Sequence, residues 1–150
     1  MEVGSPKQTL SVGGMMVSFG TGRNITVDGA QNVIVNTALT GIGTDSSAGG
    51  QLLKNGTGTL YLNGSSPAWT GKITINVGGL VITNVNALGS SAGTTVINSS
   101  GGAGILDGRL VLSNNLTLTE RFTLGARQQG TLNSAHIISA ADINTLTGTS

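Results

Sequence analysis

Apolar and polar side chains alternate with a period of two along several short segments of this chain. Ile, Val and Leu occupy every second position in residues 24–27, 32–36, 59–62, 72–77, 109–112 and 116–118. The positions between them hold mostly Thr, Asn or Lys, with the exceptions Ile34, Tyr61, Arg109 and Val111. A period of two places the apolar set on one face of a β-strand. Because no segment keeps an apolar helical period over three turns, the pattern predicts an all-β chain.

The alternation also predicts which side chains of residues 72–77 point inward. The apolar set is expected in the interior: Ile73, Ile75 and Val77. The polar set is expected on the outer face: Lys72, Thr74 and Asn76. A shift of one residue in register would exchange the two sets, so this assignment is a strong constraint.

Gly-x-Leu steps recur at intervals of roughly twenty to thirty residues, a period typical of stacked structural units. They begin at Gly58, Gly78, Gly108 and Gly130. We therefore expect a right-handed parallel β-helix, a solenoid of about six rungs and on the order of 30 Å in length. The dipeptides Asn55-Gly56 and Asn63-Gly64 are also hairpin signals, which leaves an antiparallel β-sandwich as the alternative.

Composition agrees with a folded chain that has a narrow core. The chain has 150 residues and 25 of them are Gly; charged residues make up 9%, aromatic residues 3% and hydrophobic residues 37%. With so few rings, aliphatic side chains must fill the interior, and Thr, Ser and Asn must cover the surface. We treat residues 1–150 as a single β-helix segment.

One stretch, residues 50–89, carries a specific series of Gly, Leu, Thr and aromatic positions. Its members are Gly50, Leu52, Lys54, Gly56, Gly58, Thr59, Leu60, Trp69, Thr70, Gly71, Gly79, Leu80, Ala87, Leu88 and Gly89. In order and spacing this series resembles the passenger-associated transport repeat of bacterial autotransporters, also called the autotransporter-associated β-strand repeat. The family usually has Tyr where this chain has Trp69, and often Thr-Thr-Val where it has Ile73-Thr74-Ile75. The first twenty residues and the C-terminal third match weakly.

The resemblance implies a structural role outside the cell. A segment of this family would be a stalk or scaffold in a longer secreted protein, would support folding and secretion of the passenger, and would pack against adjacent β-helix rungs of the parent chain. The implied location is extracellular, at the bacterial cell surface, with an outer-membrane anchor in another part of the parent. No signal peptide or membrane-spanning run is recognisable in these 150 residues, and we expect no membrane insertion by this segment.

Two other non-enzymatic functions fit the sequence. The first is an adhesin-type module that binds a host glycan or protein, since an exposed Trp69 could stack on a sugar ring; a packed Trp69 would instead fasten its loop to the stack. The second is a filament subunit that self-assembles by end-to-end strand pairing into a homo-oligomer. Residues 143–150 are uncharged and strand-like, whereas Pro6 and Lys7 partly block the other end.

Candidate catalytic groups are sparse, so an enzyme is the least favoured class. His136 is the only histidine, and near it stands Asp142, but no Gly-x-Ser-x-Gly elbow occurs. The six carboxylates are scattered at about one per rung, whereas glycoside cleavage needs a close pair. They are Glu2, Asp28, Asp45, Asp107, Glu120 and Asp142. We expect no catalytic residues, and the sequence leaves any ligand-binding residues unknown.

Metal, cofactor and nucleic-acid sites are not expected either. The chain has no cysteine. Residues 101–107 come close to the calcium-binding nonapeptide, but Asp107 stands one residue late and the motif is not repeated. Seven basic residues balance six acids without a basic run, which argues against nucleic-acid binding. Three arginines are candidates for a small positive patch: Arg109, Arg121 and Arg127.

Overall fold

The described part of the chain forms fifteen short β-strands and no helix. The computed structural model describes residues 9–12, 17–18, 24–40, 50–99, 107–126 and 135–147 of the 150. Within these ranges, nothing helical is present that is long and apolar enough to cross a membrane. The strands are β1 (Thr9–Val12), β2 (Val17–Ser18), β3 (Ile25–Val27), β4 (Asn32–Val35), β5 (Leu39–Thr40), β6 (Leu52–Lys54), β7 (Thr59–Leu62), β8 (Ile73–Ile75), β9 (Gly79–Ile82), β10 (Thr94–Ile97), β11 (Arg109–Leu112), β12 (Thr117–Leu118), β13 (Arg121–Leu124), β14 (Ile137–Ser139) and β15 (Thr145–Leu146).

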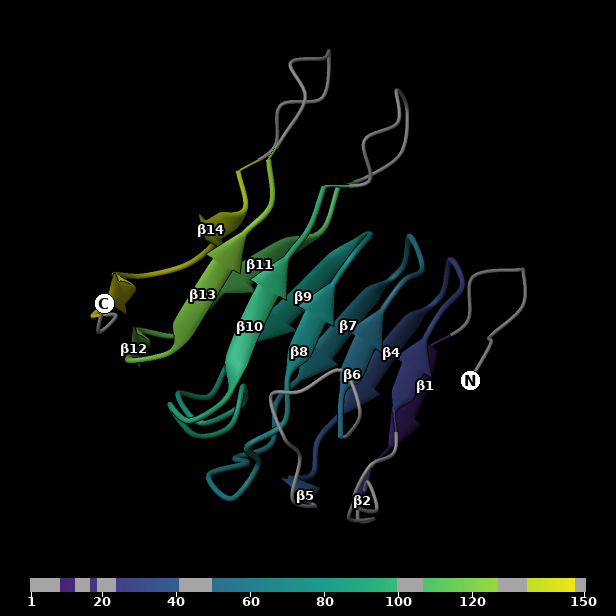
Figure 1. Ribbon diagram of the computed structural model, residues 1–150, viewed down its shortest axis with the longest axis horizontal. Helices are drawn as coiled ribbons and strands as arrows, with labels where there is room; N and C mark the ends of the chain where they lie inside the picture. Colours follow the sequence, from purple (N-terminus) through teal and green to yellow (C-terminus); the bar gives the residue numbers. More distant parts are fainter. Residues whose placement is uncertain are drawn as a thin grey trace.

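Two parallel sheets face each other and make up most of the molecule (Figure 1). The six-stranded sheet has the order β1-β4-β7-β9-β11-β14, and the five-stranded sheet has the order β13-β10-β8-β6-β3. On a third side, β2 pairs with β5 and β12 pairs with β15, again in parallel. The strands stack in chain order, as a parallel β-helix requires, so this prediction is confirmed.

The chain passes from one sheet to the other instead of turning back on itself. β6 belongs to the five-stranded sheet, and the next strand, β7, belongs to the six-stranded sheet. The turn at Asn55-Gly56 therefore forms a corner between the sheets and not a hairpin. Because every paired strand in the described residues runs parallel to its neighbour, the antiparallel β-sandwich is wrong.

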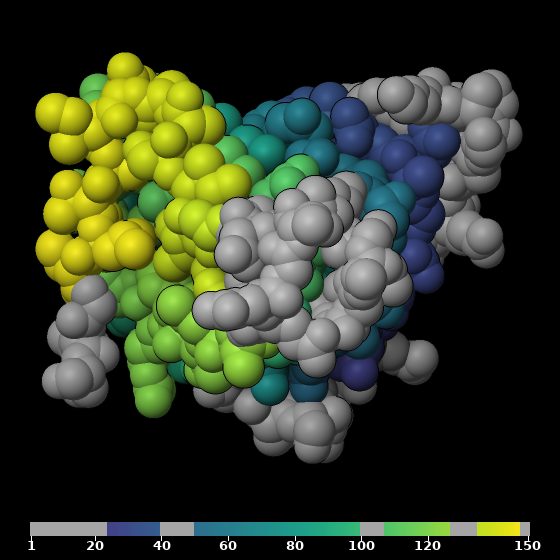
Figure 2. All heavy atoms as spheres, turned by 90° about the horizontal axis from the view of Figure 1, so that it is seen from above, coloured from purple at the N-terminus to yellow at the C-terminus, as the bar shows by residue number. Residues whose placement is uncertain are grey.

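Successive rungs differ in length, although their strands stay in register. Thr59 of β7 lies opposite Gly79 of β9, and Gly79 lies opposite Arg109 of β11. The spacing between register partners is thus twenty residues from β7 to β9 and thirty from β9 to β11. Figure 2 shows the stack from above, with the C-terminal rung at one end and the N-terminal strands at the other.

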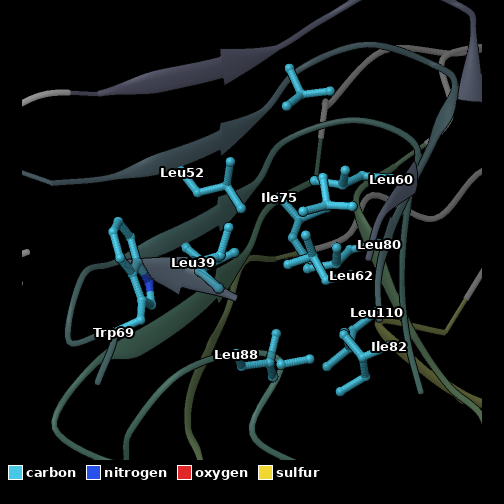
Figure 3. Close-up of a cluster of buried hydrophobic side chains, with 14 of the residues drawn as sticks. Leu39, Leu52, Leu60, Leu62, Trp69, Ile75, Leu80, Ile82, Leu88 and Leu110 are labelled. Carbon is cyan, nitrogen blue, oxygen red and sulfur yellow. The ribbon is translucent and has the colours of Figure 1, made fainter. Parts of the chain in front are cut away.

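The core is a set of apolar columns that run between the two sheets. One column on the six-stranded sheet joins Leu60, Leu80 and Leu110, whose side chains point between the sheets in Figure 3. A neighbouring column joins Leu62 and Ile82. All five side chains are buried. Because apolar side chains of one rung stack on apolar side chains of the next, the apolar face of each rung is removed from water. Contacts between neighbouring rungs stabilise solenoids in this way.

The outer faces are less polar than expected. On the six-stranded sheet the central outward column is apolar and half-buried along the stack: Ile34, Tyr61, Val81, Val111 and Ile138. On the five-stranded sheet Thr74 lies between Leu53 and Val96 in register.

The inward and outward assignment of residues 72–77 needs two corrections. Ile73 and Ile75 are buried as predicted, but Val77 is only half-buried. Its strand ends at Ile75, and the chain has already begun to turn. Thr74 is only 8% exposed, because its apolar register neighbours cover it. Half-buried Lys72 and Asn76 agree with outward positions.

Candidate functional site

The residues of the repeat series lie at the core and at the corners of two consecutive rungs. Leu52, Leu60, Leu80, Ala87 and Leu88 are all buried. Thr59 is half-buried at the start of β7, and Gly79 begins β9 in register with it. Gly50 and Gly89 have positive φ, of 63° and 101°. The series therefore marks positions that pack against the neighbouring rung.

The corner glycines are required because adjacent rungs touch there through their backbones. A Cβ on Gly56 would lie 2.0 Å from the carbonyl oxygen of Gly29, and one on Gly58 would lie 2.1 Å from that of Gln31. No real Cβ approaches a backbone atom so closely, so a side chain at either position would force the two backbones apart. The step Gly56-x-Gly58 is therefore a steric requirement of the corner between β6 and β7.

Trp69 is fully buried, at 0% exposure, against two glycines of the series. A Cβ on Gly71 would lie 2.3 Å from Cζ2 of the indole, and one on Gly89 would lie 2.7 Å from Cδ1. The backbone N–H of Ser90 donates to the Trp69 carbonyl at 2.8 Å, which ties the next loop to it. The packed Trp69 that holds its loop to the stack is therefore confirmed, and the alternative of an exposed, sugar-stacking tryptophan is wrong.

Asparagine side chains form ladders along the corners of the stack. Asn98 donates from Nδ2 to Oδ1 of Asn76 at 2.7 Å, and Asn76 donates in the same way to Asn55 at 2.7 Å. Hydrogen-bonded amide chains of this kind are typical of stacked, in-register strands. A second ladder joins three further side chains: Asn36, Asn63 and Thr83. Both ladders pin the register of successive rungs.

Lys54, a member of the repeat series, points into the interior. It is 1% exposed and stands in register between Val27 and Ile75. Its Nζ donates to the carbonyl oxygens of Gly56 and, at 3.1 Å, of Val77. Burial lowers the pKa of Lys54 from 10.5 to about 8, while the nearby Asp28 carboxylate acts in the opposite direction.

We expect the stability of the chain to rise with pH between about 8 and 10.5. Lys54 titrates at about pH 8 in the folded chain and at 10.5 when unfolded, so within this window the unfolded chain binds more protons. Below about pH 8 Lys54 is protonated in both the folded and the unfolded chain, so the folded chain bears the full free-energy cost of burying the ammonium charge. Across this window the free energy of unfolding is expected to rise by about 1–3 kcal/mol. Urea unfolding at several pH values measures it, and an equal rise in a Lys54→Met variant would contradict the assignment.

A second charged side chain, Glu120, is also buried, at 6% exposure. Its Oε1 accepts a hydrogen bond from the Thr95 hydroxyl at 3.2 Å, and Thr95 is itself fully buried in the five-stranded sheet. Neither burial was predicted. The period of two nevertheless predicts both burials. Lys54 stands two residues after buried Leu52, and Glu120 stands two residues after buried Leu118, so each side chain falls on the inward face.

The candidate catalytic residues are not brought together. The His136 ring Nε2 lies 2.7 Å from the Gly125 carbonyl oxygen. Asp142 is exposed with a φ of 59°, and the described residues show no hydrogen bond between it and His136. Asp107 accepts from Ser99 at 2.9 Å; residues 101–106 of the calcium-like motif lie outside the described ranges.

The remaining ionisable candidates are also dispersed. Arg109 stands on β11 of the six-stranded sheet and Arg121 on β13 of the five-stranded sheet, so these two do not share a face; Arg127 lies outside the described residues. Glu2 and Asp45 are likewise outside them. In the part of the chain that is described, no group of three or more His, Cys, Asp or Glu residues is placed to hold a metal ion.

Comparison of the chain with protein-family models, with curated proteins and with solved structures finds no match. The likeness to the passenger repeat thus depends on the residues of the repeat series alone.

Proposed function

We propose that this chain is a structural stalk segment of an autotransporter-like surface protein, and that it supports folding and secretion of the passenger. The observation that carries the proposal is the placement of the repeat series. Its apolar members are core residues, and Gly56, Gly58 and Gly71 stand where one rung touches the next. The series therefore describes what a rung needs in order to stack on its neighbour.

Stacking of this kind suits folding that proceeds along the chain. Each folded rung exposes strand edges, with unpaired N–H and C=O groups, on which the next rung can pair. In a solenoid the free energy is a sum of rung and nearest-neighbour terms, so folding can advance one rung at a time. On a passenger emerging from the outer membrane, burial of each new rung would hold the exported part outside. The proposed location is the cell surface, and the proposed partners are the adjacent rungs of the parent chain.

The proposal can be tested by secretion. The chain is placed between a secretory leader and an outer-membrane β-barrel translocator, and surface display is measured by protease accessibility on intact cells. A Leu80→Asp variant disrupts stacking, and a Val81→Asp variant changes the adjacent outward residue as the matched control. We expect the wild-type chain and the control to be displayed, and the Leu80→Asp chain to remain mostly in the periplasm. Equal display of all three would refute a role for rung stacking in export.

A second candidate, end-to-end self-assembly, is favoured by the exposed apolar side chains of the last described rung. Leu124, Ile143 and Leu146 are 51%, 82% and 44% exposed. Leu124 and Leu146 continue the interior columns of Ile97 and Leu118. A second copy that stacks there would cover them. Light scattering over a wide concentration range tests this candidate, and a strict monomer at high concentration would exclude it.

Glycan binding by an adhesin-type module depended on an exposed Trp69 that could stack on a sugar ring. Because Trp69 is buried, it does not support this alternative. A protein ligand for the outer faces stays an untested prediction.

A further inference from the structure

The chain contains five Asn-x-Ser/Thr triplets, and the structure separates them by exposure and hydrogen bonding. This triplet is the acceptor pattern for N-linked sugars, in which the amide nitrogen of Asn is joined to a sugar. The five triplets begin at Asn24, Asn55, Asn63, Asn98 and Asn115. Because an attached sugar is bulky and needs room at the surface, only an exposed amide nitrogen that the fold does not use can accept one.

Three of the five acceptor asparagines belong to the asparagine ladders. Asn63 donates from Nδ2 to Asn36 at 2.8 Å. Asn98 donates from Nδ2 to Asn76 at 2.7 Å, and Asn76 donates in turn to Asn55. All three acceptor residues are half-buried, and adjacent rungs are only about 4.8 Å apart. A sugar on any of them would crowd the ladder that holds its rung in register.

Asn115 differs from these three because the fold uses its oxygen and leaves its nitrogen. The residue is exposed in the turn between β11 and β12, with a φ of 52°. Its Oδ1 accepts from the backbone N–H of Ile143 at 3.0 Å. Among the described residues its Nδ2 has no hydrogen-bond partner. A sugar joined to the nitrogen keeps the amide oxygen, so the contact with the last rung would persist.

The hydroxyl of the same triplet is accessible as well. Thr117 is exposed at the start of β12, whereas Leu116, which stands between it and the acceptor, is only 5% exposed and packs in the core. The pattern requires a hydroxyl two residues after the acceptor, and here both groups are open to a transferase.

Asn24 has only one of these two features. It is exposed, and its Oδ1 accepts from the backbone N–H of Gln51 at 3.2 Å, as at Asn115. The hydroxyl residue of its triplet, Thr26, is half-buried on β3. Asn24 is therefore the weaker of the two exposed acceptors.

We propose that Asn115 is an acceptor site for an N-linked sugar. The co-substrate is a sugar activated at its anomeric carbon through a phosphate, on either a nucleotide or a lipid. In the transfer, Nδ2 of Asn115 forms a bond to the anomeric carbon, and the bond from that carbon to the phosphate oxygen breaks. The amide nitrogen loses one proton to a base of the transferase. The inference concerns a modification site and is independent of the stalk role.

The test is glycosylation of the folded wild-type chain in vitro, followed by mass spectrometry of its peptides. One arm uses a soluble Asn-x-Ser/Thr transferase with UDP-glucose, and the other uses a membrane oligosaccharyltransferase with a lipid-linked sugar. Each enzyme is first shown to modify a synthetic peptide of residues 113–119. We expect a sugar on Asn115 in at least one arm, which also identifies the donor, and slower transfer to Asn24.

The ladder asparagines are the internal comparison. Transfer to Asn55, Asn63 or Asn98 requires a ladder to open first, so we expect it to be slower than transfer to Asn115 by about tenfold or more. The comparison is made within one wild-type chain and does not depend on how a variant folds. An unmodified Asn115 in both arms, or transfer to a ladder asparagine as fast as to Asn115, would overturn the proposal.

Variants at the hydroxyl position test the triplet itself. Thr117→Val keeps the shape of the side chain and leaves Asn115 in place, and it should abolish transfer to Asn115, whereas Thr117→Ser should retain it. Thr119→Val changes the next exposed threonine, which belongs to no triplet, and is the matched control that should be modified normally. Unchanged transfer in Thr117→Val would contradict the site. Failure of the secretion assay would leave these results unchanged, so the two proposals can fail separately.

Discussion

We expect a Gly58→Ala variant to lose about 2–4 kcal/mol of folding free energy, a large share of the stability of an ordinary domain. The added Cβ would lie 2.1 Å from the Gln31 carbonyl oxygen and 2.8 Å from the Ala30 carbonyl carbon. Both atoms belong to the backbone of the preceding rung, so the contact can be relieved only by moving two rungs apart. Such overpacking is among the few causes of severe destabilisation.

Gly79→Ala is the matched control, because Gly79 belongs to the same repeat series. A Cβ there would meet the Thr59 side chain at 3.4 Å, an ordinary van der Waals contact. The substitution also restricts the unfolded chain, so the stability should stay within about 0.5 kcal/mol or rise slightly. Urea unfolding of the two variants measures the difference. Equal losses at Gly58 and Gly79 would contradict the backbone contact described for the corner.

A Leu80→Asp substitution should be the most damaging single change considered, with a loss above about 4 kcal/mol. Leu80 is 0% exposed, and its register neighbours are Leu60 and Leu110, neither of which can pair with a carboxylate. At the next position Val81 is half-buried on the outer face, and Val81→Asp should cost about 1 kcal/mol. Thermal unfolding followed by circular dichroism compares them; similar melting temperatures would show that the inward and outward assignment is wrong.

Ile75→Asp should be less damaging than Leu80→Asp, although Ile75 is also 0% exposed. Its register neighbour is Lys54, whose buried ammonium could pair with the new carboxylate. Thermal unfolding followed by circular dichroism compares the two variants, and we expect the higher melting temperature for Ile75→Asp.

The strands were largely predictable, because their alternation is a local property. Residues 59–62 and 109–112 were expected as strands and are β7 and β11. Strand partners are not local: Asn55-Gly56 carries the same local signal whether the chain folds back as a hairpin or turns a corner to another sheet. The recurrence of Gly-x-Leu steps favoured the second reading, and the parallel register confirms it.

The buried charges were missed because charged residues were assumed to face solvent. The alternation by itself pointed Lys54 and Glu120 inward, and both are buried. What the sequence could not show is how their burial is compensated. The carbonyl of Val77 and the hydroxyl of Thr95 come from other rungs, and which atoms meet across rungs depends on the length of every intervening loop.

A half-open groove of about 270 Å³ on the loop side of the stack was not predictable for the same reason. Its lining joins Pro67, Val85 and Glu120, which are far apart in the chain and meet only once the rungs have stacked. The sequence shows Trp69 and the asparagines as residues. That they connect one rung to the next follows only from the strand register, which brings the asparagine side chains together.

Disulfide trapping tests the parallel, in-register stack most directly, and the chain is suited to it because it contains no cysteine. Tyr61 and Val81 are register partners on adjacent strands, and Val111 is the next partner along the same column. Adjacent strands lie about 4.8 Å apart, within disulfide reach, whereas alternate strands are about twice as far and beyond it. Under mild oxidation of the folded protein, we expect the Tyr61→Cys/Val81→Cys pair to form an intramolecular disulfide and the Tyr61→Cys/Val111→Cys pair to stay reduced. Failure of the first pair to close, or equal closure of both, would contradict the stack.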